Sequence, residues 1–254
     1  MKLSIITVNR NNAAGLEKTI RSVICQKFID YEFIIIDGNS TDNSVEIIEK
    51  YAEHIAYWVS EPDKGIYNAM NKGILQAQGD YVICMNSGDC FFAPDTLSKV
   101  FATEHTADFV VGHVRMPYKG FMLDLKAPSK LSFYHFFIDT LQHQATFTKR
   151  NLFDELGWYD ETLKIVSDWK FALLAIIKYN KSVEIVDEYI ALMEPSGLSG
   201  SKEAGDILRK EKENTLKVCF PYLYHDYLEL HKWKRLTFQR WKRSIRWIFI
   251  NNKN

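Results

Sequence analysis

Two apolar segments of this chain each end beside a carboxylate, and these two acids are the residues best placed to carry chemistry. Residues 33–36 (Phe-Ile-Ile-Ile) run into Asp37-Gly38, and residues 81–85 (Tyr-Val-Ile-Cys-Met) run through Asn86 and Ser87 to Gly88-Asp89. In an open α/β sheet, ligands bind beyond the carboxyl ends of the strands, so both acids are expected to face one crevice. A carboxylate beside a glycine, where the backbone can be approached closely, suits a divalent cation that carries the phosphates of a nucleotide.

Further polar residues follow the other predicted strands at the same edge. Thr7 and Asn9 end the segment that starts at Leu3, and Asp63-Lys64-Gly65 follows the segment 56–60. A single Asp after a strand is often a turn residue or a helix cap. Because such residues recur after several successive strands, the pattern indicates a ligand site instead.

The elements that must hold these residues alternate between strands and helices. Short apolar runs predict strands at residues 3–8, 33–36, 56–60, 81–85, 107–114, 142–148 and 183–192. Helices with one apolar face are expected after each of the first three strands, at 152–156 and 168–179, and from about residue 203 to the end. This alternation predicts an α/β fold with a mostly parallel central sheet flanked by helices. The Pro-, Gly- and aromatic-rich residues 116–134 are expected to be irregular and to shape an acceptor pocket.

The composition is that of an ordinary globular protein, with 46% hydrophobic residues, 25% charged residues and a formal net charge of zero. The 254 residues allow a large domain with an appendage, which we expect to divide into residues 1–200 and 201–254. Four cysteines without a CxxC pair favour reduced thiols in a cytoplasmic protein. The chain begins with a strand-like run rather than an apolar leader, and no apolar run approaches the roughly 20 residues of a membrane span.

Taken in order, several segments resemble the family 2 glycosyltransferases, which are inverting enzymes with the GT-A fold. The sequence Glu-Pro-Asp-Lys-Gly-Ile-Tyr at 61–67 is similar to the branch of that family found in capsule, O-antigen and colanic-acid biosynthesis. The likeness lies within residues 1–200 and is carried by residues 4–11, 22–26, 36–42, 60–73, 79–81, 86–89 and 167–169. It implies transfer of a sugar from a nucleoside-diphosphate sugar (UDP, GDP or dTDP) to a hydroxyl of a cell-surface glycan acceptor, which is lipid-linked in many such enzymes.

The resemblance assigns donor-binding roles position by position. Thr7 and Asn9 would line the pocket for the base, and Asp37 would hydrogen-bond the base or ribose. Asp63 and Lys64 would lie near the ribose and pyrophosphate. Many family members have two acids where this chain has Asp37-Gly38, so the usual pair of acids is incomplete here.

The resemblance also assigns the reaction centre. Asn86 would contact the donor nucleotide, and Asp89 matches the last acid of the family's DxD-type motif, so it would bind Mg²⁺ or Mn²⁺ on the diphosphate. Asp89 is the only acid in that motif, which is adequate for a Mg²⁺ ion that keeps several waters. Asp168 stands at the family's ED-type motif and would be the general base, although it could also cap the following helix. His143 would contact the acceptor or diphosphate, with a core histidine as the alternative.

The last part of the chain is basic and rich in tryptophan. Residues 231–250 contain no acid, and on a helix Trp233, Thr237, Trp241 and Ile245 would share one stripe beside the cations. Such helices suit an anionic membrane surface, which would place the protein peripherally on the inner face of the membrane. The alternatives are packing on the catalytic domain or in a homodimer. Nucleic acid is not an expected partner, because no nucleic-acid-binding fold accompanies the segment.

Two other functions compete with the transferase. A nucleotidyltransferase would need a Gly-rich loop after the first strand, and residues 9–12 (Asn-Arg-Asn-Asn) contain no glycine. A catalytically degenerate scaffold protein that binds sugar nucleotides in a polysaccharide assembly complex would fit the reduced DxD motif. Loss of transfer without loss of donor binding in an Asp168→Asn variant would separate the enzyme from the scaffold.

Overall fold

The computed structural model describes the backbone of residues 2–194 and 202–251, and side chains for 2–194, 204–234, 236 and 237. The chain forms two compact units, Met1–Leu208 and Arg209–Asn254. The boundary predicted at residue 200 lies outside the described residues and stays a prediction.

Parallel strands form the first half of the sheet, in the order β3-β2-β1-β4. Their bounds are Leu3–Asn9 for β1, Tyr31–Asp37 for β2, Tyr57–Ser60 for β3 and Tyr81–Cys84 for β4. β1 is buried along its whole length and β2 nearly so, which explains why both are almost continuous apolar runs rather than alternating ones. Their carboxyl ends place Asn9 beside Asp37 and Asp37 beside Ser60.

Two antiparallel steps then continue the sheet. β8 (Thr146–Lys149) pairs antiparallel with β4, and β6 (Phe109–Tyr118) pairs antiparallel with β8. β6 therefore runs in the same direction as β1 and β4. β9 (Val183–Leu192) is parallel to β6, and the short β5 (Cys90–Phe91) closes the far edge. The carboxyl ends of β1, β2, β4, β6 and β9 consequently meet one edge, where β8 begins.

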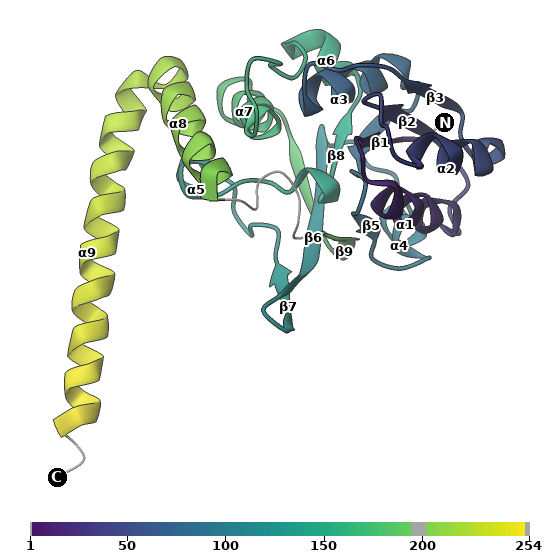
Figure 1. Cartoon of the computed structure of the whole chain (residues 1–254). Helices are drawn as coiled ribbons and strands as arrows, with labels where there is room; N and C mark the ends of the chain where they lie inside the picture. The colour runs from purple at the N-terminus through teal and green to yellow at the C-terminus, as the bar shows by residue number, and fades with distance from the viewer. Residues whose placement is uncertain (1, 195–201, 252–254) are drawn as a thin grey trace. The chain divides into compact units, whose positions relative to one another are not determined.

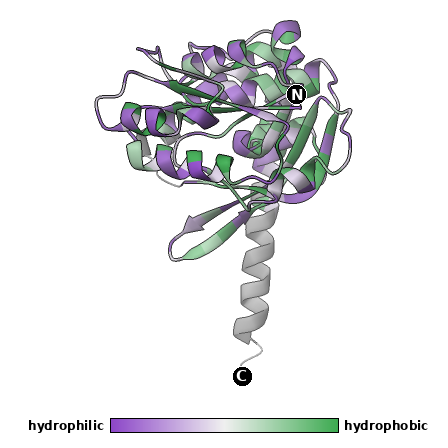
Figure 2. Cartoon of the chain, turned by 90° about the vertical axis from the view of Figure 1, so that its right-hand side faces the viewer, coloured by the Kyte–Doolittle hydropathy of each residue, from purple (hydrophilic) through white to green (hydrophobic). Residues whose placement is uncertain are grey.

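Helices cover both sides of this sheet (Figure 1). The parallel half is connected by α1 (Ala13–Ile24), α2 (Ser44–Lys50) and α3 (Ile66–Gln76). The Asn12 side chain caps α1 by accepting a hydrogen bond from the Gly15 N–H at 3.1 Å. Hydrophobic and hydrophilic residues are mixed on the helices, as expected of helices with one buried face (Figure 2). The other helical segments of this unit are η1 (Ala52–His54), α4 (Thr96–Val100), α5 (Phe133–Ile138), η2 (His143–Ala145), α6 (Asn151–Leu156), α7 (Ser167–Leu173) and the π-helical turn η3 (Leu174–Lys178).

These elements agree with the predicted α/β, GT-A-type fold class, and the predicted strand 183–192 has the same bounds as β9. The predicted irregular stretch 116–134 is different. Its first part is a β-hairpin, because β6 continues to Tyr118 and pairs with β7 (Phe121–Leu125). Lys119 and Gly120 both have positive φ, at 48° and 86°, as the two central residues of a tight hairpin turn require. Pro117 within the strand and a Lys at the first turn position conceal this hairpin in the sequence.

Gly79, in the connection between α3 (Ile66–Gln76) and β4, lies directly against the backbone of β1. A Cβ built on Gly79 would come within 2.6 Å of the Ser4 backbone nitrogen and 2.7 Å of the Leu3 carbonyl carbon, both in a central strand that has no room to move. We expect Gly79→Ala to lower the free energy of unfolding by about 1–3 kcal/mol, the usual cost of overpacking a core. Urea denaturation measures this. Gly205→Ala is the matched control, because nothing lies within 4 Å of a Cβ built on Gly205. An unchanged free energy of unfolding for Gly79→Ala would contradict the close packing of Gly79 against β1.

The second unit is helical, as predicted for this region. α8 (Lys202–Cys219) spans the boundary between the units, and α9 (Pro221–Asn251) begins with a proline at its first turn, where a missing N–H has no cost. Within the unit, the Tyr224 hydroxyl donates a hydrogen bond to Glu213 at 3.1 Å. No helix in the described part of the chain is both long enough and apolar enough to cross a membrane.

Candidate active site

A cavity of about 400 Å³ lies at the edge where the strands end. Its wall is built by the segment after β4, the residues just before β8, the start of α7, the face of α3 and the residues after β9. The polar residues of this wall include Asn86, Asp89, His143, Asp168, Tyr67 and Glu194. The structure therefore brings together four predicted site residues that lie up to 82 positions apart in the sequence, from Asn86 to Asp168.

Asp168 is held at the start of α7 by hydrogen bonds to both oxygens. His143 Nδ1 lies 3.2 Å from Asp168 Oδ2, and the Tyr67 hydroxyl lies 2.8 Å from Asp168 Oδ1. Since an ionised carboxylate only accepts hydrogen bonds, Nδ1 of His143 carries the proton of that contact. The Tyr67 hydroxyl also lies 2.6 Å from the Ile165 carbonyl oxygen, and its single proton serves one acceptor at a time.

The pair of His143 and Asp168 favours charges on both partners. Burial alone would raise the pKa of Asp168, but the hydrogen bond and positive charge of His143, together with Tyr67, outweigh it and the pKa is lowered. Burial alone would lower the pKa of His143, but Asp168 and the charge of Asp89 outweigh it and the pKa is raised. The carboxylate is therefore ionised at neutral pH and available as a proton acceptor.

Asn86 supports the same arrangement from the other side of the imidazole. Its Nδ2 lies 3.1 Å from His143 Nε2, while its Oδ1 is buried without a hydrogen-bond partner. The two amide atoms are interchangeable by a rotation of the side chain. With the amide rotated, Oδ1 would accept a hydrogen bond from the Nε2–H of a His143 that carries two protons, in agreement with the raised pKa of His143.

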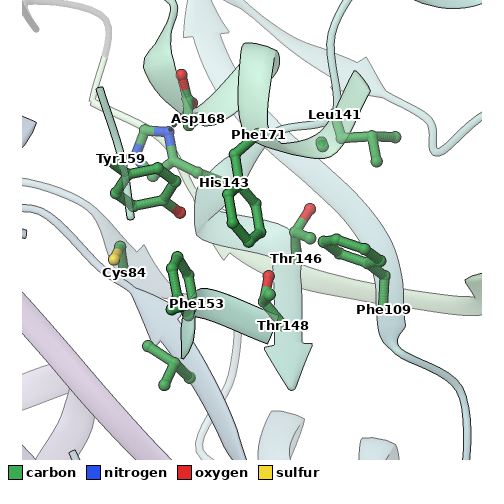
Figure 3. A pocket seen from close by; sticks show the side chains of 12 residues that line it. Cys84, Phe109, Leu141, His143, Thr146, Thr148, Phe153, Tyr159, Asp168 and Phe171 are labelled. Atoms are coloured by element: carbon green, nitrogen blue, oxygen red, sulfur yellow. Dashed lines mark hydrogen bonds and ion pairs between the residues drawn. The ribbon is translucent and has the colours of Figure 1, made fainter. Parts of the chain in front are cut away.

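Beneath this pair the protein is closely packed and apolar. A small internal cavity of about 20 Å³ is lined by Cys84, Phe153, Tyr159 and Phe171 together with the inner sides of His143 and Asp168 (Figure 3). Burial raises the pKa of Cys84 to about 12, so it remains a neutral thiol. Thr146 and Thr148 also line this cavity, and its volume is enough for about one water molecule.

Asp89 lies in the same cavity with 6% of its surface exposed. Its Oδ1 accepts a hydrogen bond from the Glu194 backbone N–H at 2.8 Å, which ties the end of β9 to this loop. Thr19 on α1 fixes the loop from below, accepting from the Gly88 N–H at 2.9 Å and donating to the Asp89 carbonyl at 2.7 Å. Burial raises the pKa of Asp89, and this cost would be removed by a cation.

The chemistry of Asp89 fits a hard divalent cation shared with a ligand. Among the described residues no group of three or more His, Cys, Asp and Glu side chains is arranged to hold a metal ion. One buried carboxylate with diphosphate oxygens and waters is a donor set that Mg²⁺ accepts. Asp89 fits the predicted metal in this shared form, and its role stays a prediction.

Thr7, Asn9 and Asp37 lie at the ends of β1 and β2, outside the lining of this cavity. The Asp37 carboxylate is fully buried and accepts hydrogen bonds from Asn9 Nδ2, the Ser40 N–H and hydroxyl, and the Ser60 hydroxyl, at 2.6–2.9 Å. The Thr7 hydroxyl donates to the Met85 carbonyl at 2.7 Å. These residues brace the strand ends, and direct contact of Asp37 with a nucleotide would require one of its four donors to be exchanged. Burial tends to raise the pKa of Asp37, but these hydrogen bonds lower it overall.

Asp63 and Lys64 lie just before α3. The Asp63 carboxylate accepts a hydrogen bond from the Gly65 N–H at 2.9 Å and covers Gly38, where a built Cβ would be 2.2 Å from Asp63 Oδ2. Lys64 is exposed. The structure therefore joins Asp63 to the end of β2, and the predicted contact with ribose and pyrophosphate remains a prediction.

Sequence reasoning did not assign a role to Tyr67 or Glu194. Tyr67 is the second residue of α3, two positions after Gly65. It lies within the segment 60–73 that resembles the family, and its hydroxyl is buried against Asp168. Glu194 follows β9 and pairs with Lys18 at 3.3 Å beside Asp89. The sequence at 197–201 (Gly-Leu-Ser-Gly-Ser) is consistent either with a loop that closes over the diphosphate or with an ordinary surface loop, and it lies outside the described residues.

Tyr67 is a positioning residue for Asp168, and its removal should be visible in the pH profile. We expect Tyr67→Phe to reduce the transfer rate about tenfold, because a hydrogen bond to a charged group is lost. The pKa of Asp168 should rise, so the acid limb of the rate profile moves to higher pH. Tyr81→Phe is the matched control, since that hydroxyl donates to the Ala107 carbonyl at 2.6 Å, at the other end of β4. If the acid limb of the rate profile of Tyr67→Phe lies at the same pH as in the original chain, Tyr67 does not lower the pKa of Asp168.

Known proteins share both the sequence and the fold of this chain. A family model described as Glycosyl transferase family 2 matches residues 4–156. An uncharacterized glycosyltransferase of Mycobacterium tuberculosis is 34% identical over 185 residues, which cover 69% of this chain and 69% of that protein. The similarity in sequence thus includes the β1 to β8 part of the sheet.

Two solved structures show the same fold at low sequence identity. S. aureus TarS 1–349 in complex with UDP-GlcNAc matches with a TM-score of 0.64 and 20% identity, over 85% of this chain and 67% of that one. This chain spans 42% of the longer TarS structure. The mannosyltransferase PcManGT from Pyrobaculum calidifontis, in complex with GDP-Man and Mn²⁺, matches with a TM-score of 0.66 and 17% identity, over 87% of this chain and 64% of that one. The fold is therefore of the GT-A type, and the chain belongs to glycosyl transferase family 2.

Proposed function

We propose that this protein is an inverting glycosyltransferase that moves a sugar from a nucleoside-diphosphate sugar to a hydroxyl of a glycan acceptor. The observation that carries this proposal is the sharing of one cavity by Asp168, a carboxylate with a lowered pKa, and Asp89, a carboxylate suited to a diphosphate-bound cation. Acid–base chemistry and leaving-group binding are the two requirements of glycosyl transfer. Nucleotide sugars are bound in the complexes of TarS and PcManGT, which have the same fold.

Asp168 would act on the acceptor. The acceptor hydroxyl donates a hydrogen bond to the carboxylate, loses its proton to Asp168 and attacks the anomeric carbon from the face opposite the diphosphate. This single displacement inverts the configuration of that carbon. His143 stabilises the ionised carboxylate before the reaction.

Asp89 and Lys64 would act on the leaving group. Asp89 would hold Mg²⁺ or Mn²⁺ on the diphosphate; when bound, such an ion absorbs the negative charge that builds on the departing oxygens. Lys64, exposed before α3, would add a second positive charge. Asn9 and Asp37 would shape the base end of the site by fixing the ends of β1 and β2.

The acceptor is proposed to be lipid-linked, with α9 resting on the membrane surface. Residues 231–250 contain seven Lys and Arg residues and no acid, and a basic, Trp-rich helix binds anionic lipid headgroups. This would place the protein peripherally at the inner face of the membrane. A homodimer formed through the same helix is the alternative, and the capsule or O-antigen type of pathway stays a prediction.

A donor panel tests the proposed function. UDP-, GDP- and dTDP-sugars are screened with and without Mn²⁺ for a rise in melting temperature and for release of nucleoside diphosphate. We expect one donor to stabilise the protein only with the metal and to be hydrolysed slowly without acceptor. A donor that stabilises the protein but is neither hydrolysed nor transferred to extracted lipid-linked glycans would favour the scaffold alternative, and the absence of any donor effect would overturn the proposal.

A further inference from the structure

The hairpin of β6 and β7 carries an apolar tip, which we define as residues 117–122. Three large side chains of this tip are about half exposed: Tyr118 at 42%, Phe121 at 54% and Met122 at 50%. The Tyr118 and Phe121 rings contact each other edge to face with centroids 5.6 Å apart. The hairpin stands clear of the body of its domain (Figure 1). Tyr118 and Phe121 pair across the hairpin and share one face, while Met122, the next residue of β7, lies on the other face, so both faces of the tip are apolar.

The hairpin projects from the same edge as the active site. β6 is parallel to β9, and Arg115 on β6 lies beside Leu192 on β9. The next two residues of the chain after Leu192 are Met193 and Glu194, which line the cavity. From Arg115, the strand continues three more residues to Tyr118, a further ~10 Å at about 3.3 Å per residue. The tip therefore extends past the rim of the cavity.

The base of the hairpin is firmly held, so the tip has a fixed direction. Arg115 pairs with Asp124 across the hairpin at 2.6 Å, and its guanidinium lies over the Tyr189 ring at 4.5 Å and the Phe92 ring at 5.3 Å. Tyr189 also hydrogen-bonds Asp124. These contacts pair the charges of Arg115 and Asp124 at the base of the hairpin and hold the apolar side chains at its tip in a fixed direction.

We propose that this tip inserts into the headgroup region of an anionic membrane. Residues 116–123 contain one cation, Lys119, and no acid, so the tip combines aromatic and methionine side chains with a single positive charge. Aromatic side chains favour the membrane interface, and a cation there is attracted by anionic lipids.

A second copy of the chain fits this tip less well than a membrane. At 150–250 Å² per aromatic side chain, the two half-exposed rings offer roughly 200 Å² of apolar surface, and Met122 adds one further half-exposed side chain. A stable protein–protein interface buries about 800 Å² on each partner. Insertion of a small tip needs no such area, since the lipid surrounds each side chain. The inference rests on the proposed function only for the lipid-linked nature of the acceptor; the binding test below needs neither donor nor transfer.

An environment-sensitive label on the tip tests the proposal in the full-length chain. An NBD fluorophore is attached at Met122→Cys in a Cys25→Ser, Cys219→Ser background, because the remaining cysteines, Cys84 and Cys90, are buried. With phosphatidylcholine vesicles that contain phosphatidylglycerol, we expect a blue shift and quenching by doxyl-labelled lipids. The control label is placed at Ile29→Cys, which is 89% exposed just before β2 and therefore at the opposite edge of the sheet. That label should stay in water.

Three outcomes would overturn the proposal. If the protein sediments with vesicles while the label at position 122 stays in water, α9 alone makes the contact. If the label shifts without vesicles and the shift grows with protein concentration, the tip meets a second copy of the chain. Absence of both vesicle binding and any shift is likewise contrary to the proposal.

Substitutions separate this role from the enzyme activity. We expect the double variant Phe121→Ser, Met122→Ser to lower vesicle affinity at least about tenfold, because apolar area is lost from the inserted surface. Ile29→Ser, Leu75→Ser removes two exposed apolar side chains elsewhere and should have no effect. Lys119→Glu should weaken binding to anionic vesicles only. Hydrolysis of the nucleotide sugar in water should be equal in all variants, so failure of the donor panel and failure of this inference give different results.

Discussion

The Asp168→Asn variant will bind its nucleotide sugar as tightly as the original chain and transfer the sugar about 10²–10⁴ times more slowly, the usual contribution of a positioned general base. Asparagine keeps the size of the side chain and an oxygen that accepts from His143 or Tyr67, which lie 3.2 Å and 2.8 Å from the carboxylate oxygens. It does not accept the proton of the acceptor hydroxyl. Donor affinity from calorimetry and transfer rates from nucleoside diphosphate release measure the two effects separately.

The pH dependence gives an independent check of the same assignment. Because His143 and Tyr67 outweigh burial and lower the pKa of Asp168, the base is ionised throughout the neutral range, and its contribution to activity is lost as pH decreases through this lowered pKa. The stability of the fold depends on pH in the same direction. The hydrogen bonds of Asp168 with His143 and Tyr67 stabilise the folded protein fully above the ordinary pKa of an Asp, and this stabilisation is lost as pH falls through the lowered pKa. Asp154→Asn is the control, since Asp154 is an exposed acid paired with Arg150. Normal turnover of Asp168→Asn would exclude Asp168 as the base.

The Asp89→Asn variant should lose metal-dependent donor binding without losing stability. Several kcal/mol of charge stabilisation are available from a divalent cation on a leaving group, so we expect transfer to fall at least about 100-fold. Burial raises the pKa of Asp89, which means that its ionised form is unfavourable in the fold without a cation. A neutral Asn that still accepts the Glu194 N–H hydrogen bond should therefore leave the melting temperature of the ligand-free protein equal or higher.

Titration with Mn²⁺ provides the matched measurement. In the original chain the stabilisation by donor plus Mn²⁺ should weaken as pH falls, because protons compete with the metal for Asp89. In Asp89→Asn that pH dependence should disappear together with the metal effect. Equal Mn²⁺-dependent stabilisation in both proteins would show that the metal is held elsewhere.

Much of the fold is local in origin and could be predicted from the sequence. The alternation of apolar runs and amphipathic helices defines β1 to β4 and their crossovers, because buried parallel strands require continuous apolar residues. Gly38 and Gly88 lie in the predicted loops, and other side chains come close to their backbone there, that of Asp63 at Gly38 and that of Glu194 at Gly88. The family resemblance, carried by ordered segments at strand ends, is confirmed by the matching family model.

The parts that the sequence did not predict depend on pairing between distant segments. The residues of β8 do not by themselves indicate that this strand pairs antiparallel with both β4 and β6. This pairing nevertheless brings His143 to the edge where the parallel strands end. Likewise, the contact of Tyr67 with Asp168 joins residues 101 positions apart. The hairpin turn at Lys119-Gly120 was concealed by its unusual first residue and by Pro117.

The late arrival of β8 has a consequence for the newly made chain. Tyr81 on β4 pairs with Lys149 on β8, and the wall of the cavity is completed by residues still later in the chain, Asp168, Met193, Glu194 and Leu208. A ribosome-bound fragment that ends before residue 193 lacks part of this wall, together with the Glu194 N–H that donates to Asp89 Oδ1. The cavity is therefore complete only after most of the chain has been synthesised.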